Sequence, residues 1–158
     1  MRTPLLFFAA GLPKAQPRAK ARAMGKFAQV YNPKTADDWK MIVRNEARRA
    51  WEASGNTSPW EGPLCVNLTF YFPRIGSHFK GQSAAAKAAN APRIVKDNAP
   101  RWHTTKPDRD NCDKAVMDAM TNLGVWHDDK QVCDGRIRKF YADRTPGCLI
   151  EIKEAIYE

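Results

Sequence analysis

The order of hydrophobic and polar positions along the chain predicts strands and helices in one domain. Residues 4–10 and 63–72 are short apolar runs with the β-branched and aromatic side chains typical of strands. Between them, residues 35–55 repeat apolar side chains at helical spacing, with Thr35 as a candidate cap and Gly55 as a stop. The face of this helix that is expected to pack on the core comprises Trp39, Ile42, Val43, Ala47, Ala50 and Trp51.

The last third of the chain predicts a second helix and two further strands. Residues 110–123 carry a second apolar stripe, formed by Cys112, Ala115, Val116, Ala119, Met120 and Leu123, and Gly124 follows as a stop. Strand-like runs follow at 131–143 and 148–156, and the Pro146–Gly147 turn between them predicts a hairpin. We therefore expect an α/β (α+β) fold in which two main helices pack on a small mixed β-sheet.

Two segments lack hydrophobic periodicity. Residues 11–30 are rich in Pro, Gly and basic side chains, which predicts a basic N-terminal loop. Residues 74–105 mix an alanine-rich stretch with Gly and Pro, which predicts a long flexible loop with one short helix at 83–90. The length of 158 residues suits a single domain that spans residues 1–158.

The net charge of the chain predicts a polyanionic partner. The chain has 26 Lys and Arg against 17 Asp and Glu, a net charge of +9, which favours nucleic acid because basic surfaces release counterions from phosphates. The candidate phosphate contacts of the N-terminal loop are Lys14, Arg18, Lys20, Arg22 and Lys26, although such a run can also be only a solvated surface. No apolar stretch approaches 20 residues, so no membrane span is expected. The four scattered cysteines predict free thiols in the cytosol rather than zinc or disulfides.

Acidic residues are concentrated around the second helix of this otherwise basic chain. They are Asp108, Asp110, Asp113, Asp118 and the pair Asp128–Asp129. One acidic residue is enough to cap a helix, so a D-x-D pair exceeds what capping requires. Two carboxylates at this spacing can face one divalent cation, and Asp129 would complete such a site if its strand lies beside the start of the helix. An EF-hand is excluded, because Asp113 and Ala119 occupy its Gly and Glu positions.

The same letters resemble a known family. Residues 106–119 read K-P-D-x-D-N-x-x-K-x-x-x-D-A and residues 124–132 read G-V-W-x-D-D-K-Q-V, a combination similar to the RusA family of Holliday junction resolvases. The N-terminal half also resembles this family, through Gly11, Pro13, Lys14, Pro17, Arg18 and Tyr31–Asn32–Pro33. Arg109 and Cys112 depart from its usual apolar residues, and the loop at 76–105 is longer, which leaves the preferred DNA branch open.

The resemblance implies a homodimer that cuts branched DNA, including four-way junctions, by paired symmetric nicks with Mg²⁺ or Mn²⁺. By this resemblance Asp108, Asp110 and Asp129 are the catalytic metal ligands, Lys114 is the catalytic lysine, and Asp128 is a further candidate ligand. Lys106, Arg109 and Lys130 join the N-terminal cations as candidate DNA contacts. The expected setting is the bacterial cytoplasm, in a phage or prophage. A flap nuclease, a non-catalytic DNA-binding protein and a phage interaction subunit remain alternatives.

Overall fold

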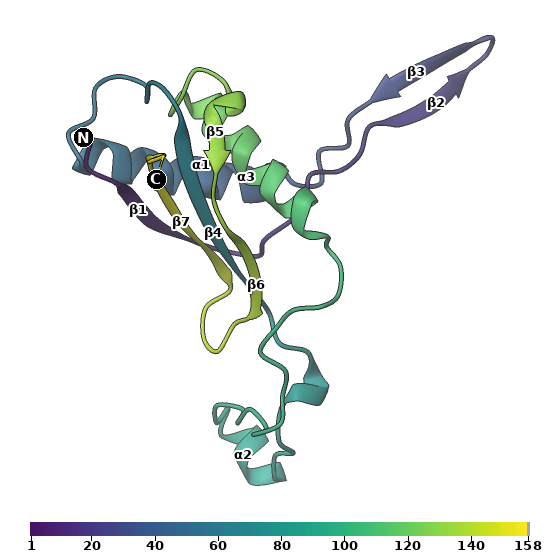
Figure 1. Cartoon of the computed structure of the whole chain (residues 1–158). Coiled ribbons are helices and arrows are strands. Elements are labelled where there is room, and N and C mark those ends of the chain that lie inside the picture. Colours follow the sequence, from purple (N-terminus) through teal and green to yellow (C-terminus); the bar gives the residue numbers. More distant parts are fainter. Residues whose placement is uncertain (158) are drawn as a thin grey trace.

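A five-stranded mixed sheet forms the centre of the molecule, and two long helices pack on it (Figure 1). The structure is a computed structural model that describes residues 1–157. The sheet consists of β1 (Leu5–Ala10), β4 (Leu64–Phe72), β5 (Val132–Asp134), β6 (Ile137–Tyr141) and β7 (Gly147–Glu154). The helices are α1 (Asp37–Ala53) and α3 (Arg109–Leu123). The predicted fold class is confirmed, with a mixed sheet and two main helices in one domain.

Strand β4 organises the pairing of the sheet. β7 lies between β1 and β4 and is antiparallel to both, whereas β5 and β6 pair with β4 in parallel. The predicted hairpin of the last two strands is therefore wrong, because β4 separates β6 from β7. β4 takes this place because both of its faces are largely buried, which suits a strand that has neighbours on each side.

The run at 131–143 is divided into two strands at Gly135. A Cβ at this position would overlap the Val66 carbonyl oxygen of β4, and the backbone has φ +145°. A side chain would therefore be excluded by contact with the neighbouring strand.

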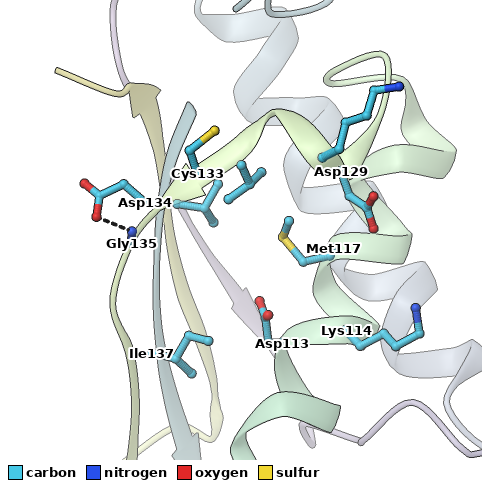
Figure 2. A pocket seen from close by; sticks show the side chains of 11 residues that line it. Asp113, Lys114, Met117, Asp129, Cys133, Asp134, Gly135 and Ile137 are labelled. Atoms are coloured by element: carbon cyan, nitrogen blue, oxygen red, sulfur yellow. Dashed lines mark hydrogen bonds between the residues drawn. The ribbon is translucent and has the colours of Figure 1, made fainter. Parts of the chain in front are cut away.

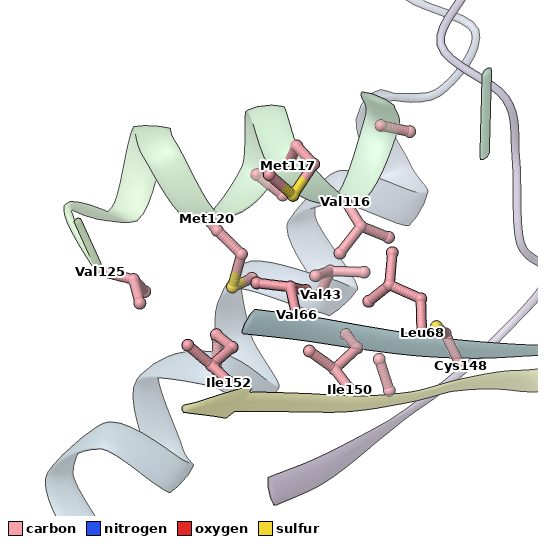
Figure 3. Packing of buried hydrophobic residues seen from close by; sticks show 14 of the residues in the cluster. Val43, Val66, Leu68, Val116, Met117, Met120, Val125, Cys148, Ile150 and Ile152 are labelled. Carbon is pink, nitrogen blue, oxygen red and sulfur yellow. The ribbon is translucent and has the colours of Figure 1, made fainter. Parts of the chain in front are cut away.

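The core lies between the sheet and the two helices. Figure 3 shows Val116, Met117 and Met120 of α3 above Val66 and Leu68 of β4, beside Val43 of α1. Both predicted apolar stripes pack against this core, and Met117 belongs to it as well. Burial of each such side chain contributes roughly 1.5–3 kcal/mol to the free energy of unfolding. Most of the stability of the protein therefore comes from the packing of the sheet against its helices.

The helix ends agree with the sequence pattern at α3 and at the C-terminus of α1, where Gly55 follows the last turn with φ +72°, but not at the N-terminus of α1. α1 begins at Asp37 with Ala36 as its N-cap, so the predicted Thr35 cap is wrong. Two acidic residues in the first turn, Asp37 and Asp38, stabilise this end through the helix dipole instead. α3 ends at Gly124, as expected, which adopts the left-handed conformation at φ +82°.

Residues 11–19 of the basic N-terminal segment are irregular, as predicted, but the rest of the predicted loop is a β-hairpin. β2 (Lys20–Met24) and β3 (Phe27–Tyr31) form a separate two-stranded sheet that extends from the body in Figure 1. Its sequence has no apolar alternation of the usual kind, because neither strand buries a side chain. Backbone pairing with Gly25 at the turn produces the hairpin instead.

The segment between β4 and α3 contains two short helices, η1 (Gly76–His78) and α2 (Ala84–Ala88). Its return is tied to β6, because His103 N–H donates to the Lys139 carbonyl at 3.0 Å and Tyr141 N–H to the Arg101 carbonyl at 2.8 Å. The His103 ring stacks on Phe72, with ring centroids 4.0 Å apart. The chain is thus anchored shortly before it enters α3.

None of the helices in residues 1–157 is both long enough and apolar enough to cross a membrane. All four cysteines are thiols in this part of the chain, three of them buried. Burial raises the pKa of the Cys112 thiol to about 11, so this thiol stays protonated.

Candidate active site

The start of α3 is held by β6 rather than by an aspartate cap. The ammonium group of Lys139 on β6 donates hydrogen bonds to the Thr105 carbonyl, at 2.8 Å, and to the Pro107 carbonyl. Asp108 is the N-cap residue, yet within the described residues its side chain makes no capping hydrogen bond. The carboxylate of Asp108 is therefore not used to hold the helix terminus, which removes the simplest structural explanation for it.

The two neighbouring aspartates after α3 have different surroundings. The Asp128 side chain accepts a hydrogen bond from Lys130 N–H at 2.9 Å and forms a capping box with Gln131, at the start of η2 (Asp129–Gln131). The backbone hydrogen bond from Lys130 also holds the pKa of Asp128 below its ordinary value. Asp128 thus shapes the turn, and its exposed neighbour Asp129 is presented by that turn.

Gln131 fixes this turn to the body. Its side-chain amide donates to the Trp60 carbonyl at 3.0 Å and the Gly62 carbonyl at 3.1 Å, and its oxygen accepts from His127 N–H at 2.8 Å. These bonds connect η2 to the segment that enters β4. Gln131 is therefore a positioning residue for Asp129.

A pocket of about 640 Å³ opens between α3, η2 and the β5–β6 segment. Figure 2 shows Asp113 and Lys114 on α3 and Asp129 on η2 along one side of it, with Met117 between them. The carboxylate of Asp134 lies across the pocket, points away from them and accepts from Gly135 N–H at 2.7 Å. Apart from Asp134, two carboxylates, Asp113 and Asp129, and two lysines, Lys114 and Lys130, therefore line the same open cavity.

The electrostatics of the pocket centre on Asp113. Burial raises the pKa of Asp113 above its ordinary value, and the negative charges of Asp110 and Asp129 raise it further, although Arg109 opposes them. Asp129 and Asp110 are thus near enough to destabilise the Asp113 carboxylate. A cation placed among them would relieve this repulsion.

Lys114 is held by an acidic partner beside the pocket. Its ammonium lies 3.6 Å from Asp118, one helical turn away, and Lys40 of α1 approaches the same carboxylate at 3.6 Å. Asp118 therefore connects α1 to α3 and restrains Lys114.

The predicted ligand set of Asp108, Asp110 and Asp129 stays a prediction. Across residues 1–157, no three His, Cys, Asp or Glu side chains come together closely enough to hold a metal ion. Asp108 lines a second pocket with Arg18, Lys106, Pro107 and Asn111, at the root of the hairpin. Asp110 is exposed in the first turn of α3 and lines neither pocket.

The predicted DNA contacts lie in three different surroundings. Lys20, Arg22 and Lys26 lie on the hairpin, and Arg18 precedes it beside Lys106. Two others have acidic partners: Lys14 contacts Asp38 at 2.6 Å, and Lys130 lies 3.6 Å from Asp128. Arg109 is exposed, and its positive charge opposes the rise in the pKa of Asp113.

Asp113 is not among the site residues that the sequence predicts. The helical pattern places it on the polar side of α3, directly before Lys114, and that position is the available signal. Asp129 cannot be paired with it from the sequence, because the path of the chain around Gly124 and η2 decides which carboxylates meet.

Comparison with known proteins identifies the family. The model of the endodeoxyribonuclease RusA family matches residues 10–153. The chain belongs to the RusA family. It is also 32% identical over 96 residues to "Uncharacterized protein YqaN" of Bacillus subtilis (strain 168), an alignment that covers 59% of this chain and 58% of that protein, and so less than two thirds of that relative. The family match includes the hairpin, the acidic helix and the Asp128–Asp129 turn.

Proposed function

We propose that this RusA-family chain is a metal-dependent endodeoxyribonuclease that resolves Holliday junctions by paired symmetric nicks. The observation that carries the proposal is the presentation of Asp129 by the capped turn at the pocket that Asp113 and Lys114 line. The match to the endodeoxyribonuclease model over residues 10–153 supports the reaction class.

The carboxylates that line the pocket have the ligand chemistry that a magnesium ion requires. Mg²⁺ in proteins is commonly held by one or two carboxylates and completed by water and substrate phosphate, so a third protein carboxylate is unnecessary. Asp113 and Asp129 would supply the two carboxylates, and the negative charge of Asp129 adds to the rise in the pKa of Asp113 that burial causes. Mn²⁺ takes the same oxygen ligands and would substitute. Asp110, whose charge acts on Asp113, is a further candidate ligand, and both Asp110 and Asp108 remain predictions from the family resemblance.

A divalent ion bound in this pocket would activate water and stabilise the leaving oxygen of a phosphodiester. Lys114 lies next to Asp113 and directs positive charge to the same pocket, where it would stabilise the negative charge that develops on the phosphate. Asp118 and Lys40 restrain this lysine from the α1 side. Asp128 and Gln131 keep Asp129 at the opening.

The proposed substrate is a four-way DNA junction, because it matches the basic side chains of the chain and the two pockets of a homodimer. The hairpin cations and those beside Asp108 would hold phosphates of the DNA next to the pockets. Two copies in a homodimer would place one pocket on each of two strands of a four-way junction, as paired nicks require. We place this activity in the bacterial cytoplasm, in a phage or prophage setting.

One cleavage experiment separates this function from its alternatives. The purified protein is incubated with a four-way junction, a flap and a linear duplex, with and without Mg²⁺. Symmetric nicks in the junction alone, only with the metal, are expected. Preferential cutting of the flap would indicate a general branch nuclease. Binding of all three substrates without cutting would indicate a DNA-binding protein and contradict the proposal.

A further inference from the structure

The β2–β3 hairpin has no role in the core. All ten residues of its two strands are exposed, and they include large apolar side chains: Phe27 is 80% exposed and Met24 50%. In Figure 1 the hairpin extends away from the sheet and both helices. Apolar side chains that remain in water at the end of such a projection indicate a surface for a partner.

The pairing register gives the hairpin two different faces. Directly opposite residues share a face, so Lys20–Tyr31, Arg22–Gln29 and Met24–Phe27 form one face of long side chains. Ala21, Ala23, Ala28 and Val30 form the other, which is small and apolar. The first face changes from cationic along the shaft to apolar at the tip.

The tip is a tight turn at Gly25–Lys26. Gly25 has φ +62° and occupies the first central position, which is the glycine position of a type II′ turn. Met24 and Phe27 flank this turn as the last pair of the ladder, so they form the leading apolar edge. The five residues of each strand extend this edge roughly 17 Å from the root of the hairpin.

The positive charge of the hairpin indicates which kind of partner it binds. The first 36 residues contain no Asp or Glu, and five cations flank or lie on the hairpin: Arg18, Lys20, Arg22, Lys26 and Lys34. A cationic shaft of this kind matches a phosphate backbone. Its root adjoins the pocket of Asp108, because Arg18 and Asp108 line the same cavity.

We propose that the hairpin is a wedge for the branch point of a DNA junction. Phe27 and Met24 stack on the base pair that is exposed where the arms diverge, and the shaft cations contact the phosphates of the adjoining arms. Apolar side chains are used in this way between base steps, and a branch point already lacks part of its stacking. This inference rests on the proposed function and adds the means by which branched DNA is distinguished from a continuous duplex.

The test uses the full chain and a four-way junction that carries 2-aminopurine beside the branch point, without divalent metal so that binding occurs without cutting. The wild type should raise the fluorescence as the base loses its stacking. Phe27→Ala should remove most of this increase and lower the preference for junction over linear duplex by about ten-fold, as expected for the loss of one base–aromatic contact. Phe27→Trp should retain both properties, and Val30→Ala, on the opposite face, should behave as the wild type.

The outcomes distinguish the wedge from the nuclease proposal. If the wild type nicks the junction with Mg²⁺ but Phe27→Ala leaves fluorescence and preference unchanged, the wedge is refuted and the nuclease remains. If the wild type neither prefers nor nicks the junction, both proposals fail. If sedimentation shows that Phe27→Ala or Val30→Ala dissociates a dimer, the hairpin binds a second copy of this chain and the wedge is again refuted. Circular dichroism checks that each variant is folded.

Discussion

The acidic pocket and the basic hairpin are held in place by opposite means. Asp113 lies half-buried on a helix whose other side is core, and the turn of Asp129 is fixed by the four hydrogen bonds of the Gln131 side chain. The hairpin buries no side chain of its strands, and its root is tied by the Lys14–Asp38 ion pair and by Gln16 N–H, which donates to the Asn111 carbonyl at 2.9 Å.

This difference indicates a division of labour. The metal-binding pair that we propose needs fixed geometry, which the packed body provides. The DNA-binding arm that we propose needs reach and charge, and it tolerates an absence of packing. Substitutions in the pocket should therefore abolish cutting without loss of binding, whereas substitutions in the hairpin should weaken binding without changing the chemical step.

The largest effect is expected from Asp129→Asn. The change keeps the shape of the side chain but removes a charge from the pocket, so nicking should fall by about 10²- to 10³-fold. Gel-shift affinity for the junction should stay within about two-fold of the wild type, since the phosphate contacts that position a protein on DNA come from cations elsewhere on the chain. Asp134→Asn is the matched control, because Asp134 lines the same pocket but points away. Equal losses in both variants would argue against a special role for Asp129.

A loss of about 10²-fold in the single-turnover nicking rate is expected from Lys114→Gln, which removes a positive charge from the pocket. Asp118→Asn supplies the comparison, since it breaks the ion pairs with Lys114 and Lys40 but leaves both cations in place. We expect this variant to keep most of its activity. If it is as inactive as Lys114→Gln, Asp118 has a direct role in the reaction.

A smaller effect, on binding alone, is expected from Lys20→Ala combined with Arg22→Ala. Each lost phosphate contact reduces the magnitude of the slope of log affinity against log salt by about 0.9. The slope of the double variant should therefore be smaller than that of the wild type by roughly 1.8. At saturating protein the nicking rate should be unchanged. Arg48→Ala with Arg49→Ala, on the solvent face of α1, removes the same charge and should leave the slope unaltered. Equal effects of the two pairs would show that only net charge matters.

The smallest effect concerns stability and pH. The pKa of Asp113 is raised in the folded protein, so between roughly pH 4 and that raised value the folded state binds more protons than the unfolded state. The free energy of unfolding therefore decreases as pH rises through this window and stays lower at neutral pH. Without metal, Asp113→Asn should melt slightly above the wild type at pH 7, and the gap should close towards pH 4. A lower melting temperature at pH 7 would contradict this account.

The sequence predicts the parts of the fold that depend on local pattern. The apolar stripes of α1 and α3 are confirmed by the burial of Trp39, Val43, Val116 and Met120. The partners of the strands are not a local property, and for this reason the pattern does not predict the order that places β4 between β6 and β7. The hairpin escapes prediction for another reason: its strands bury no side chain, so no alternation marks them.

For the candidate site, too, the sequence predicts the local features but not the contacts between distant residues. The acidic motif, the Asp128–Asp129 pair and the family resemblance can all be recognised in the sequence. Which carboxylates meet depends on the rotation of α3 and on the direction of η2. Those two features place Asp129 at the pocket of Asp113 and leave Asp108 beside Arg18.

The most direct test of the account is a calorimetric titration of Mn²⁺ into three forms of the protein. The account predicts that the wild type binds the ion, that Asp113→Asn with Asp129→Asn removes this binding, and that Asp108→Asn with Asp110→Asn retains a measurable part of it. Unchanged binding by the Asp113 and Asp129 double variant, with complete loss in the Asp108 and Asp110 variant, would contradict the assignment of the metal to this pocket.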